Sequence, residues 1–320
     1  MLSKMRGGAG PNRTAAHGVY AASLLNSHIL ELELTLVSWR SQTTRGDIWD
    51  AIERVIAIVG CQRSGTTLTG QIIGALPQAF LVDEPDGLYP WFHAETRGRD
   101  EAASLGGAMI ESAKAKYRSG EEGRDCGGVT VLVLKAPNLT YDVDQLARLP
   151  APVSIVYPVR DPRAVVASMG RLGHIDFIGN QLRLLNDRPG MRERFAAECR
   201  LIENETQPRW IRQAAIWDVK SSMGPDYRQA GFPVTQFKYE DLVREPDRLI
   251  STILKGCHLS ESDEARCSHD AYVGHGPGGT DRTRSIDAES LCNWETWLDE
   301  RQQADVIPIA GASARNFGYV

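Results

Sequence analysis

Short runs of apolar and β-branched residues recur along the chain, and each is bounded by glycine or polar positions. The run at 55–59, Val-Ile-Ala-Ile-Val, shows no polar alternation, which is typical of a strand buried on both faces of a parallel sheet. Four further runs of this kind lie at 79–82, 129–134, 153–157 and 234–237. The pattern therefore predicts several buried strands.

Segments with helical spacing of apolar residues separate these runs. They lie at about 66–76, 101–118, 141–148, 162–169, 207–223 and 246–255. Strands that alternate with helices predict an α/β fold, in which helices flank a central parallel sheet in three layers. We expect this domain to span residues 51–320.

The first fifty residues have a different character. Residues 19–39 are the most hydrophobic long segment there, but His28, Glu31 and Glu33 interrupt them. They are too polar for a bilayer span of about 20 residues, and their apolar positions recur at helical spacing. We therefore expect residues 1–50 to form an N-terminal helical extension, and we expect no membrane span.

Net charge and cysteine spacing argue against several classes of function. The chain has 36 basic and 41 acidic residues, a net charge of −5, which argues against a nucleic-acid partner. Its six cysteines form no CxxC pair, which indicates reduced thiols and a cytoplasmic location. Cys257–His258 and Cys267–His269 lack the ligand spacing of a zinc site, so we expect no metal. Formation of a homo-oligomer stays open.

The strongest motif is Gly-Cys-Gln-Arg-Ser-Gly-Thr-Thr at 60–67, between the first buried run and a helical segment. Glycines let several backbone N–H groups point at one anion, and the helix N-terminus adds its positive end. A nucleoside-triphosphate loop needs Lys where this chain has Thr66, and the basic residue here is Arg63. The loop is therefore P-loop-like, but it lacks the lysine of Mg²⁺-assisted ATP chemistry.

A second motif, Tyr-Pro-Val-Arg-Asp-Pro-Arg-Ala-Val-Val-Ala-Ser-Met at 157–169, also runs from a strand into a helix. Arg160 and Ser168 can converge on a ligand that lies against this helix, and an arginine fork can hold two phosphate oxygens. A helix cap at Asp161 is the structural alternative. Two further segments add to these motifs. Phe-Lys-Tyr-Glu-Asp-Leu at 237–242 is typical of a strand end followed by a capped helix, and residues 278–284 form a basic, glycine-rich loop.

Together these motifs resemble the sulfotransferases that use 3′-phosphoadenosine 5′-phosphosulfate (PAPS), across about residues 52–300. The resemblance implies transfer of a sulfuryl group to a hydroxyl or amine. It implies that the 5′-phosphosulfate is held by Arg63, Ser64, Gly65, Thr66 and Thr67. It implies that Arg160 and Ser168 bind the 3′-phosphate, that Tyr239 lies near the adenine, and that a late loop with Arg282, Thr283 and Arg284 closes over the 3′-phosphate. Leu68 departs from members that carry Trp there.

The resemblance also suggests the catalytic groups. Glu84, followed by Pro85, resembles the Glu-Pro of carbohydrate and tyrosyl-protein sulfotransferases, so its carboxylate is the predicted base. Phenol sulfotransferases carry His where this chain has Pro137. Lys135 is suited to stabilise the bridging oxygen, with Arg63 beside it. The structural alternatives are a strand-end Glu84 that forms a salt bridge with a neighbour, and a surface lysine at the strand end for Lys135. His93 and His174 are the other candidates for the base.

Two other functions stay open at this point. A P-loop kinase of small molecules or nucleotides would require ATP and Mg²⁺, and Thr66 argues against it. A non-catalytic nucleotide-binding protein would retain the fold without turnover. The absence of His at 137 favours Glu84 as the base and a carbohydrate-like or polar acceptor. We expect a small-molecule or carbohydrate-like acceptor, whose identity the sequence does not give.

Overall fold

The computed structural model describes residues 51–84, 129–260 and 288–320, all within the unit Gly46–Val320. The expected extension at 1–50 and the expected helix at 101–118 lie outside the described residues. No described helix is long and apolar enough to cross a membrane.

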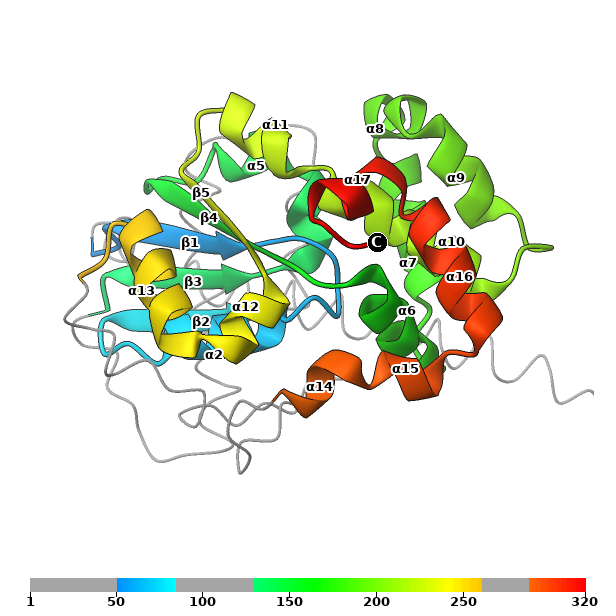
Figure 1. Ribbon diagram of the computed structural model, residues 1–320. Helices are drawn as coiled ribbons and strands as arrows, with labels where there is room; N and C mark the ends of the chain where they lie inside the picture. Colours follow the sequence, from blue (N-terminus) through cyan, green and yellow to red (C-terminus); the bar gives the residue numbers. More distant parts are fainter. Residues whose placement is uncertain (1–50, 85–128, 261–287) are drawn as a thin grey trace, which may run out of the picture. The chain divides into compact units, whose positions relative to one another are not determined.

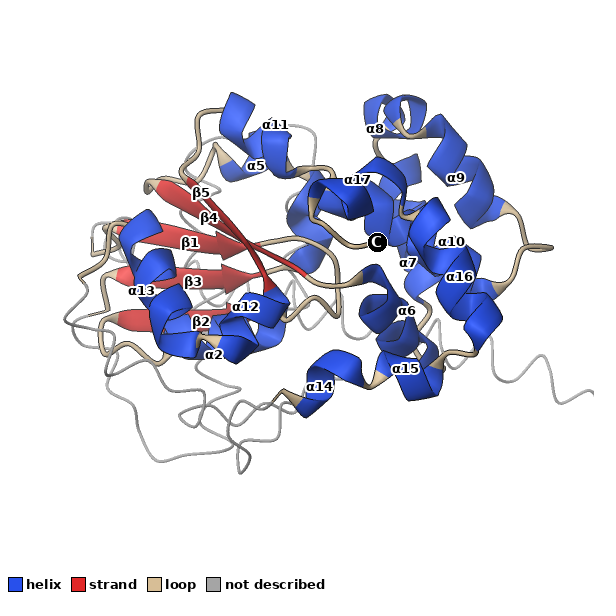
Figure 2. Ribbon diagram, in the orientation of Figure 1, coloured by secondary structure: helices blue, strands red, loops and turns tan. Residues whose placement is uncertain are grey.

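The described part of the chain contains a five-stranded sheet in which every pair of neighbours is parallel. The strands follow the order β2-β3-β1-β4-β5 (Figure 2). Their bounds are β1 Arg54–Ile58, β2 Ala79–Asp83, β3 Val131–Lys135, β4 Val153–Val159 and β5 Val234–Lys238. All five predicted strands are confirmed, with ends shifted by one or two residues.

Because the strands are parallel, their carboxyl ends meet at one edge of the sheet. The pairing register places Lys135 beside both Ile58 and Asp83, and Val159 beside Lys238. The chain leaves β1 toward β2 and leaves β4 toward β5, so β1 and β4 flank a topological switch point. Ligands of open α/β sheets bind at the carboxyl edge beside such a point.

Helices cover both faces of the sheet, which confirms the expected three-layer α/β fold. On one face, Ile56 and Ile58 of β1 share a buried cluster with residues of α2 (Thr66–Gly74) and α13 (Pro246–Gly256). On the other face, Val55 and Ala57 pack in the cluster that contains α7 (Phe177–Asn186) and α10 (Arg209–Ser221). Successive side chains of a strand point to opposite faces, so one apolar run serves both layers.

The remaining helices include a group that packs around α10, to the right of the sheet in Figure 1. The remaining helices are the 3₁₀ helix η1 Pro137–Tyr141, α5 Val143–Leu146, α6 Pro162–Arg171, α8 Pro189–Arg194, α9 Ala196–Glu203, α11 Gly224–Gln229, α12 Tyr239–Arg244, α14 Glu289–Cys292, α15 Trp294–Trp297, α16 Glu300–Ile309 and α17 Gly311–Asn316. The helix predicted at about 141–148 is confirmed in a shorter form as α5, and η1 ends just before it, at Tyr141.

Candidate active site

The loop between β1 and α2 has the tight backbone that its glycines predict. Gly60 and Gly65 have φ angles of 120° and 89°, in the region that favours glycine. A Cβ atom on Gly65 would lie 2.2 Å from the Tyr239 ring, so a side chain there would collide with the ring. Arg63 also has a positive φ, 70°, which is uncommon for a residue with a side chain and clusters at ligand sites.

The floor of this loop is η1. The backbone N–H of Gly60 donates to Thr140 Oγ1 at 2.9 Å, and this hydroxyl lies 2.9 Å from the carbonyl oxygen of Gly60. Ser64 is fully buried within the loop, and its hydroxyl has no hydrogen-bond partner among the described residues. A buried hydroxyl of this kind normally has a partner, so the Ser64 hydroxyl fits a bound anion's oxygen.

The structure brings the two anion motifs together. Arg63 Nε donates to Ser168 Oγ of α6 at 2.9 Å, across 105 residues of sequence. Arg160 Nη1 donates to the Arg63 carbonyl oxygen at 3.3 Å. Burial, followed by the nearby charge of Arg160, lowers the pKa of the Arg63 guanidinium. Two guanidinium groups that repel each other at a buried loop are stabilised by an anion between them.

Tyr239 lies at the start of α12, directly after β5. Its ring occupies the space above Gly65, and the Arg160 guanidinium lies over the same ring at 4.6 Å from the centroid. The next residue, Glu240, accepts hydrogen bonds from the Asp161 backbone N–H at 2.9 Å and from the Tyr319 hydroxyl at 2.7 Å. Tyr239 therefore contacts the loop, whereas Glu240 joins α12 to the start of α6.

Asp161 caps α6, as its structural alternative predicted. Its carboxylate accepts a hydrogen bond from the Arg163 backbone N–H at 2.8 Å and pairs with the Arg163 guanidinium. Trp217 Nε1 donates to the Arg160 carbonyl oxygen at 2.9 Å. These contacts fix the backbone on both sides of the turn that presents the Arg160 side chain.

The predicted acid–base pair also meets at the carboxyl edge. The buried Lys135 ammonium forms an ion pair with Glu84 and a second one, at 2.9 Å, with Asp83. Burial disfavours the charged lysine, but the two carboxylates outweigh it and raise the pKa of Lys135. Glu84 has a positive φ, 42°, so the chain turns sharply where it presents this carboxylate.

Sequence reasoning missed Asp83 and Thr140. The pairing of β2 with β3 places Asp83 beside Lys135. The sequence of a single strand does not predict this register. Thr140 lies in η1, just before the helix predicted at 141–148, where the sequence predicted no element. Arg282, Thr283 and Arg284 lie outside the described residues, as does His93, and His174 is exposed in the turn after α6.

The remaining predicted residues lie at the loop and at the N-terminus of α2. Thr66 and Thr67 form the first turn of this helix, where backbone N–H groups lack partners within the helix. Cys257 is buried, which raises the pKa of its thiol to about 12. Cys267 and His269 lie outside the described residues, and no cluster of three metal-ligating side chains occurs within them.

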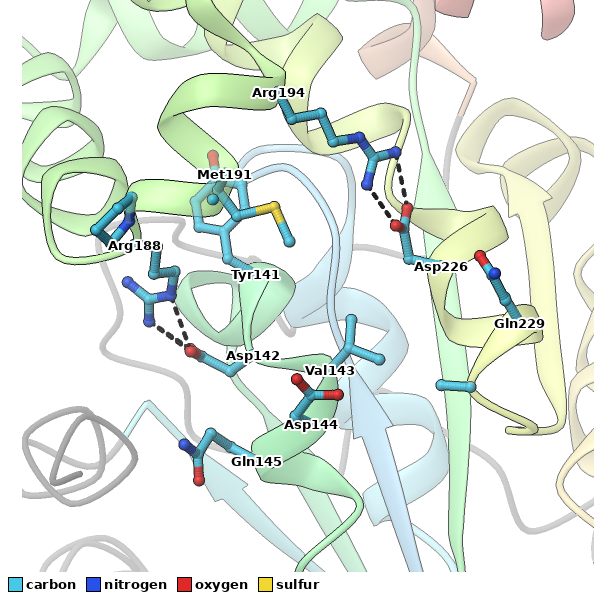
Figure 3. A pocket seen from close by; sticks show the side chains of 13 residues that line it. Tyr141, Asp142, Val143, Asp144, Gln145, Arg188, Met191, Arg194, Asp226 and Gln229 are labelled. Carbon is cyan, nitrogen blue, oxygen red and sulfur yellow. Dashed lines mark hydrogen bonds and ion pairs between the residues drawn. The ribbon is translucent and has the colours of Figure 1, made fainter. Parts of the chain in front are cut away.

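A separate pocket of about 570 Å³ lies between η1, α5, α8 and α11 (Figure 3). Two ion pairs line it, Asp142 with Arg188 at 2.6 Å and Asp226 with Arg194. These charges are satisfied by each other, and neither anion motif contributes to the lining.

Comparison with known proteins identifies the family. A sulfotransferase family model matches residues 55–263. Among solved structures, a sulfotransferase domain from the olefin synthase of Synechococcus PCC 7002 is 17% identical, with 87% of this chain and 99% of that chain covered and a TM-score of 0.49. A sulfotransferase from Alicyclobacillus acidocaldarius is 18% identical, with 80% and 94% covered and a TM-score of 0.36.

A sulfotransferase from Mycobacterium avium is 13% identical, with 84% of this chain and 78% of that chain covered and a TM-score of 0.42. No curated protein matches the sequence. The family model covers well over half of the chain and contains the loop at 60–67 and the motif at 157–169. The chain therefore belongs to the sulfotransferase family and is a PAPS-dependent transferase.

Proposed function

We propose that this enzyme transfers a sulfuryl group from PAPS to a hydroxyl or amine of a small-molecule or carbohydrate-like acceptor, with release of 3′-phosphoadenosine 5′-phosphate. The observation that carries the proposal is the hydrogen bond between Arg63 and Ser168. It joins two anion motifs from distant parts of the chain at the switch point of the sheet. A donor with two separate anionic groups requires such a double site.

In this proposal the loop holds the 5′-phosphosulfate through Arg63, the Ser64 hydroxyl, the Gly65 backbone, and the α2 N-terminus at Thr66 and Thr67. The unpartnered Ser64 hydroxyl supports that assignment. The helix N-terminus adds partial positive charge.

Arg160 and Ser168 would hold the 3′-phosphate, and Tyr239 would border the adenine. The contact of Arg160 with the Tyr239 ring supports their placement in one subsite. We also assign Arg282, Thr283 and Arg284 to the closing loop, on the resemblance alone. The helical extension at 1–50 is proposed instead from the helical spacing of its apolar residues, beside a catalytic domain at 51–320.

PAPS supplies an activated sulfuryl group when bound. The chain's own residues at the carboxyl edge of the sheet accept a proton and stabilise negative charge. Glu84 accepts the proton of the acceptor's hydroxyl or amine, while Lys135 and Arg63 stabilise negative charge on the leaving side. Because Asp83 holds Lys135 independently, protonation of Glu84 does not leave the buried ammonium without a counter-ion.

The test is calorimetric titration with 3′-phosphoadenosine 5′-phosphate, beside ATP with Mg²⁺, on the wild type and Arg160→Ala. Arg200→Ala, an exposed arginine on α9, is the matched control for loss of one positive charge. We expect tight, metal-independent binding of the bisphosphate that weakens at least about 10-fold in Arg160→Ala only. Binding of ATP with Mg²⁺ alone would refute the proposal.

A further inference from the structure

A fully buried lysine lies beneath the anion-binding loop. Lys220 of α10 has no exposed surface, and its Nζ donates to Gln62 Oε1 at 2.9 Å and to the Pro137 carbonyl oxygen at 2.7 Å. Gln62 lies inside the loop, and Pro137 begins η1. One amine thus joins α10, the loop and η1, which are distant in sequence.

Gln62 extends this contact into a network. Its amide nitrogen donates to Asn138 Oδ1, and the same oxygen accepts from Gln181 Nε2 at 3.2 Å. The Tyr141 hydroxyl donates to Gln181 Oε1 at 3.1 Å. Both polar ends of the Gln62 side chain are therefore held, and Gln62 directly precedes Arg63, whose backbone has the strained positive φ.

A buried lysine without a carboxylate partner is costly for a protein. Among the described residues no ion pair is formed by Lys220. Burial lowers the pKa of its amine to about 7. The charged and titratable groups that act on it at longer range are Cys61, Glu84, Arg188 and Asp142. An apolar side chain of equal length would avoid this cost, so the lysine's value lies in what it holds.

We propose that Lys220 is a positioning residue of the donor site. By holding the Gln62 side chain against η1, it fixes the loop from Gly60 to Gly65 and presets Arg63 for the anionic groups of the donor. The inference rests on the proposed function, because it assigns a role toward the same donor site.

The test is a double-mutant cycle read by binding of 3′-phosphoadenosine 5′-phosphate, which needs no acceptor. The variants are Lys220→Met, Gln62→Leu and the double variant. Gln213→Leu removes another buried amide from α10 and is the matched control. We expect each single variant to weaken binding about 10-fold, and the double variant to weaken it about 10-fold rather than 100-fold. The control changes affinity by less than about twofold.

The number of protons taken up on binding of the bisphosphate distinguishes a Lys220 that positions the anion site from a Lys220 that is merely structural. Near pH 8 the phosphates are already ionised, since their second pKa is about 6. Anions bound above Lys220 favour its charged form, so we expect the wild type to take up as much as about one proton on binding. Titration in buffers of different ionisation enthalpy measures this uptake. Lys220→Met abolishes it, and Gln213→Leu retains it.

The outcomes distinguish the two proposals. Wild-type binding with unchanged affinity in Lys220→Met and Gln62→Leu would overturn the positioning role and leave the donor site intact. Additive losses in the double variant would also overturn it, because the two residues would then act separately. Failure of the wild type to bind would refute the proposed function itself. If Lys220→Met does not fold, Gln62→Leu decides alone, and wild-type affinity in that variant overturns the inference.

Discussion

A methyl group on Gly65 provides a quantitative test of the loop geometry. In Gly65→Ala the new Cβ atom would lie 2.2 Å from Tyr239 Cδ2 and 2.7 Å from Cε2. Ordinary carbon–carbon contacts are about 3.5–4.0 Å, so the ring must move by more than about 1 Å. Its movement also disturbs the contact with the Arg160 guanidinium above it.

Two costs combine in this variant. An alanine in the left-handed region costs about 1–2 kcal/mol relative to glycine. Forcing a packed ring aside costs about 1–3 kcal/mol more. The sum predicts that Gly65→Ala lowers the free energy of unfolding by about 2–5 kcal/mol.

Two other glycines separate these costs. Gly231 has a φ of 87° with nothing within 4 Å of its Cβ position, so Gly231→Ala carries the backbone cost alone. Gly170 lies in α6 without a positive φ and with the same free space, so Gly170→Ala should stabilise by about 0.4–1 kcal/mol. Urea unfolding, followed by tryptophan fluorescence, measures all three on one scale.

The ring itself is tested by Gly65→Ala in a Tyr239→Ala background. Without the ring, the additional cost of the methyl group should disappear, and the substitution should then resemble Gly231→Ala. If Gly65→Ala and Gly231→Ala destabilise equally in the wild-type background, the Tyr239 ring does not lie against the loop, and the adenine-side assignment of Tyr239 loses its support.

Three further predictions concern charged groups. The unfolded state keeps Lys220 protonated to its ordinary pKa of 10.5, whereas the folded state releases the proton near 7. Stability therefore rises from pH 7 to pH 9, by about 2 kcal/mol from this group, and Lys220→Met removes that rise in urea unfolding. Glu84→Gln should leave bisphosphate affinity within about threefold of wild type and lower turnover by about 10²–10⁴-fold, measured with an acceptor that the wild type sulfates. Arg188→Ala leaves the buried Asp142 carboxylate without its ion-pair partner. It should cost about 3–5 kcal/mol in thermal or urea unfolding, and Asp142→Asn should recover part of this loss.

Each of these has a clear contrary result. An equal rise between pH 7 and pH 9 in Lys220→Met would assign the titration to another group. Full turnover in Glu84→Gln would exclude Glu84 as the base. A loss in Arg188→Ala that Asp142→Asn fails to reduce would mean that the arginine acts through packing rather than charge.

The inner strands β1 and β3 could be predicted from the sequence because strands buried on both faces appear as apolar runs, whereas the edge strand β5 carries polar residues and is only partly buried. The β4 strand shows the limit of this reasoning. The run in the sequence ends at Tyr157, and the next residue, Pro158, cannot donate to a central ladder. In the structure β4 continues to Val159, since the pairing with β1 stops at Val156 and only β5 remains alongside.

The loop and the helix starts that carry the two motifs could be predicted because their signals are local: a glycine loop before one helix, and Asp161-Pro162 at the start of another. The contacts that hold the two motifs in place could not be predicted from the sequence. Asp83 reaches Lys135 through strand register, and Lys220 lies in a correctly predicted helix whose pattern does not show that its lysine points inward. Short helices such as α8 and α11 were missed, because six residues are too few for a periodic signal.

We propose that the motifs at 60–67 and 157–169 form one donor site with a 3′-phosphate subsite. The most direct test of this proposal compares the dissociation constants of 3′-phosphoadenosine 5′-phosphate and adenosine 5′-phosphate in the wild type, Ser168→Ala and Arg160→Ala. We predict that the wild type prefers the bisphosphate by about 100-fold or more, and that both variants lose most of this preference. Equal affinity of the wild type for the two nucleotides, or an undiminished preference in both variants, would contradict the account.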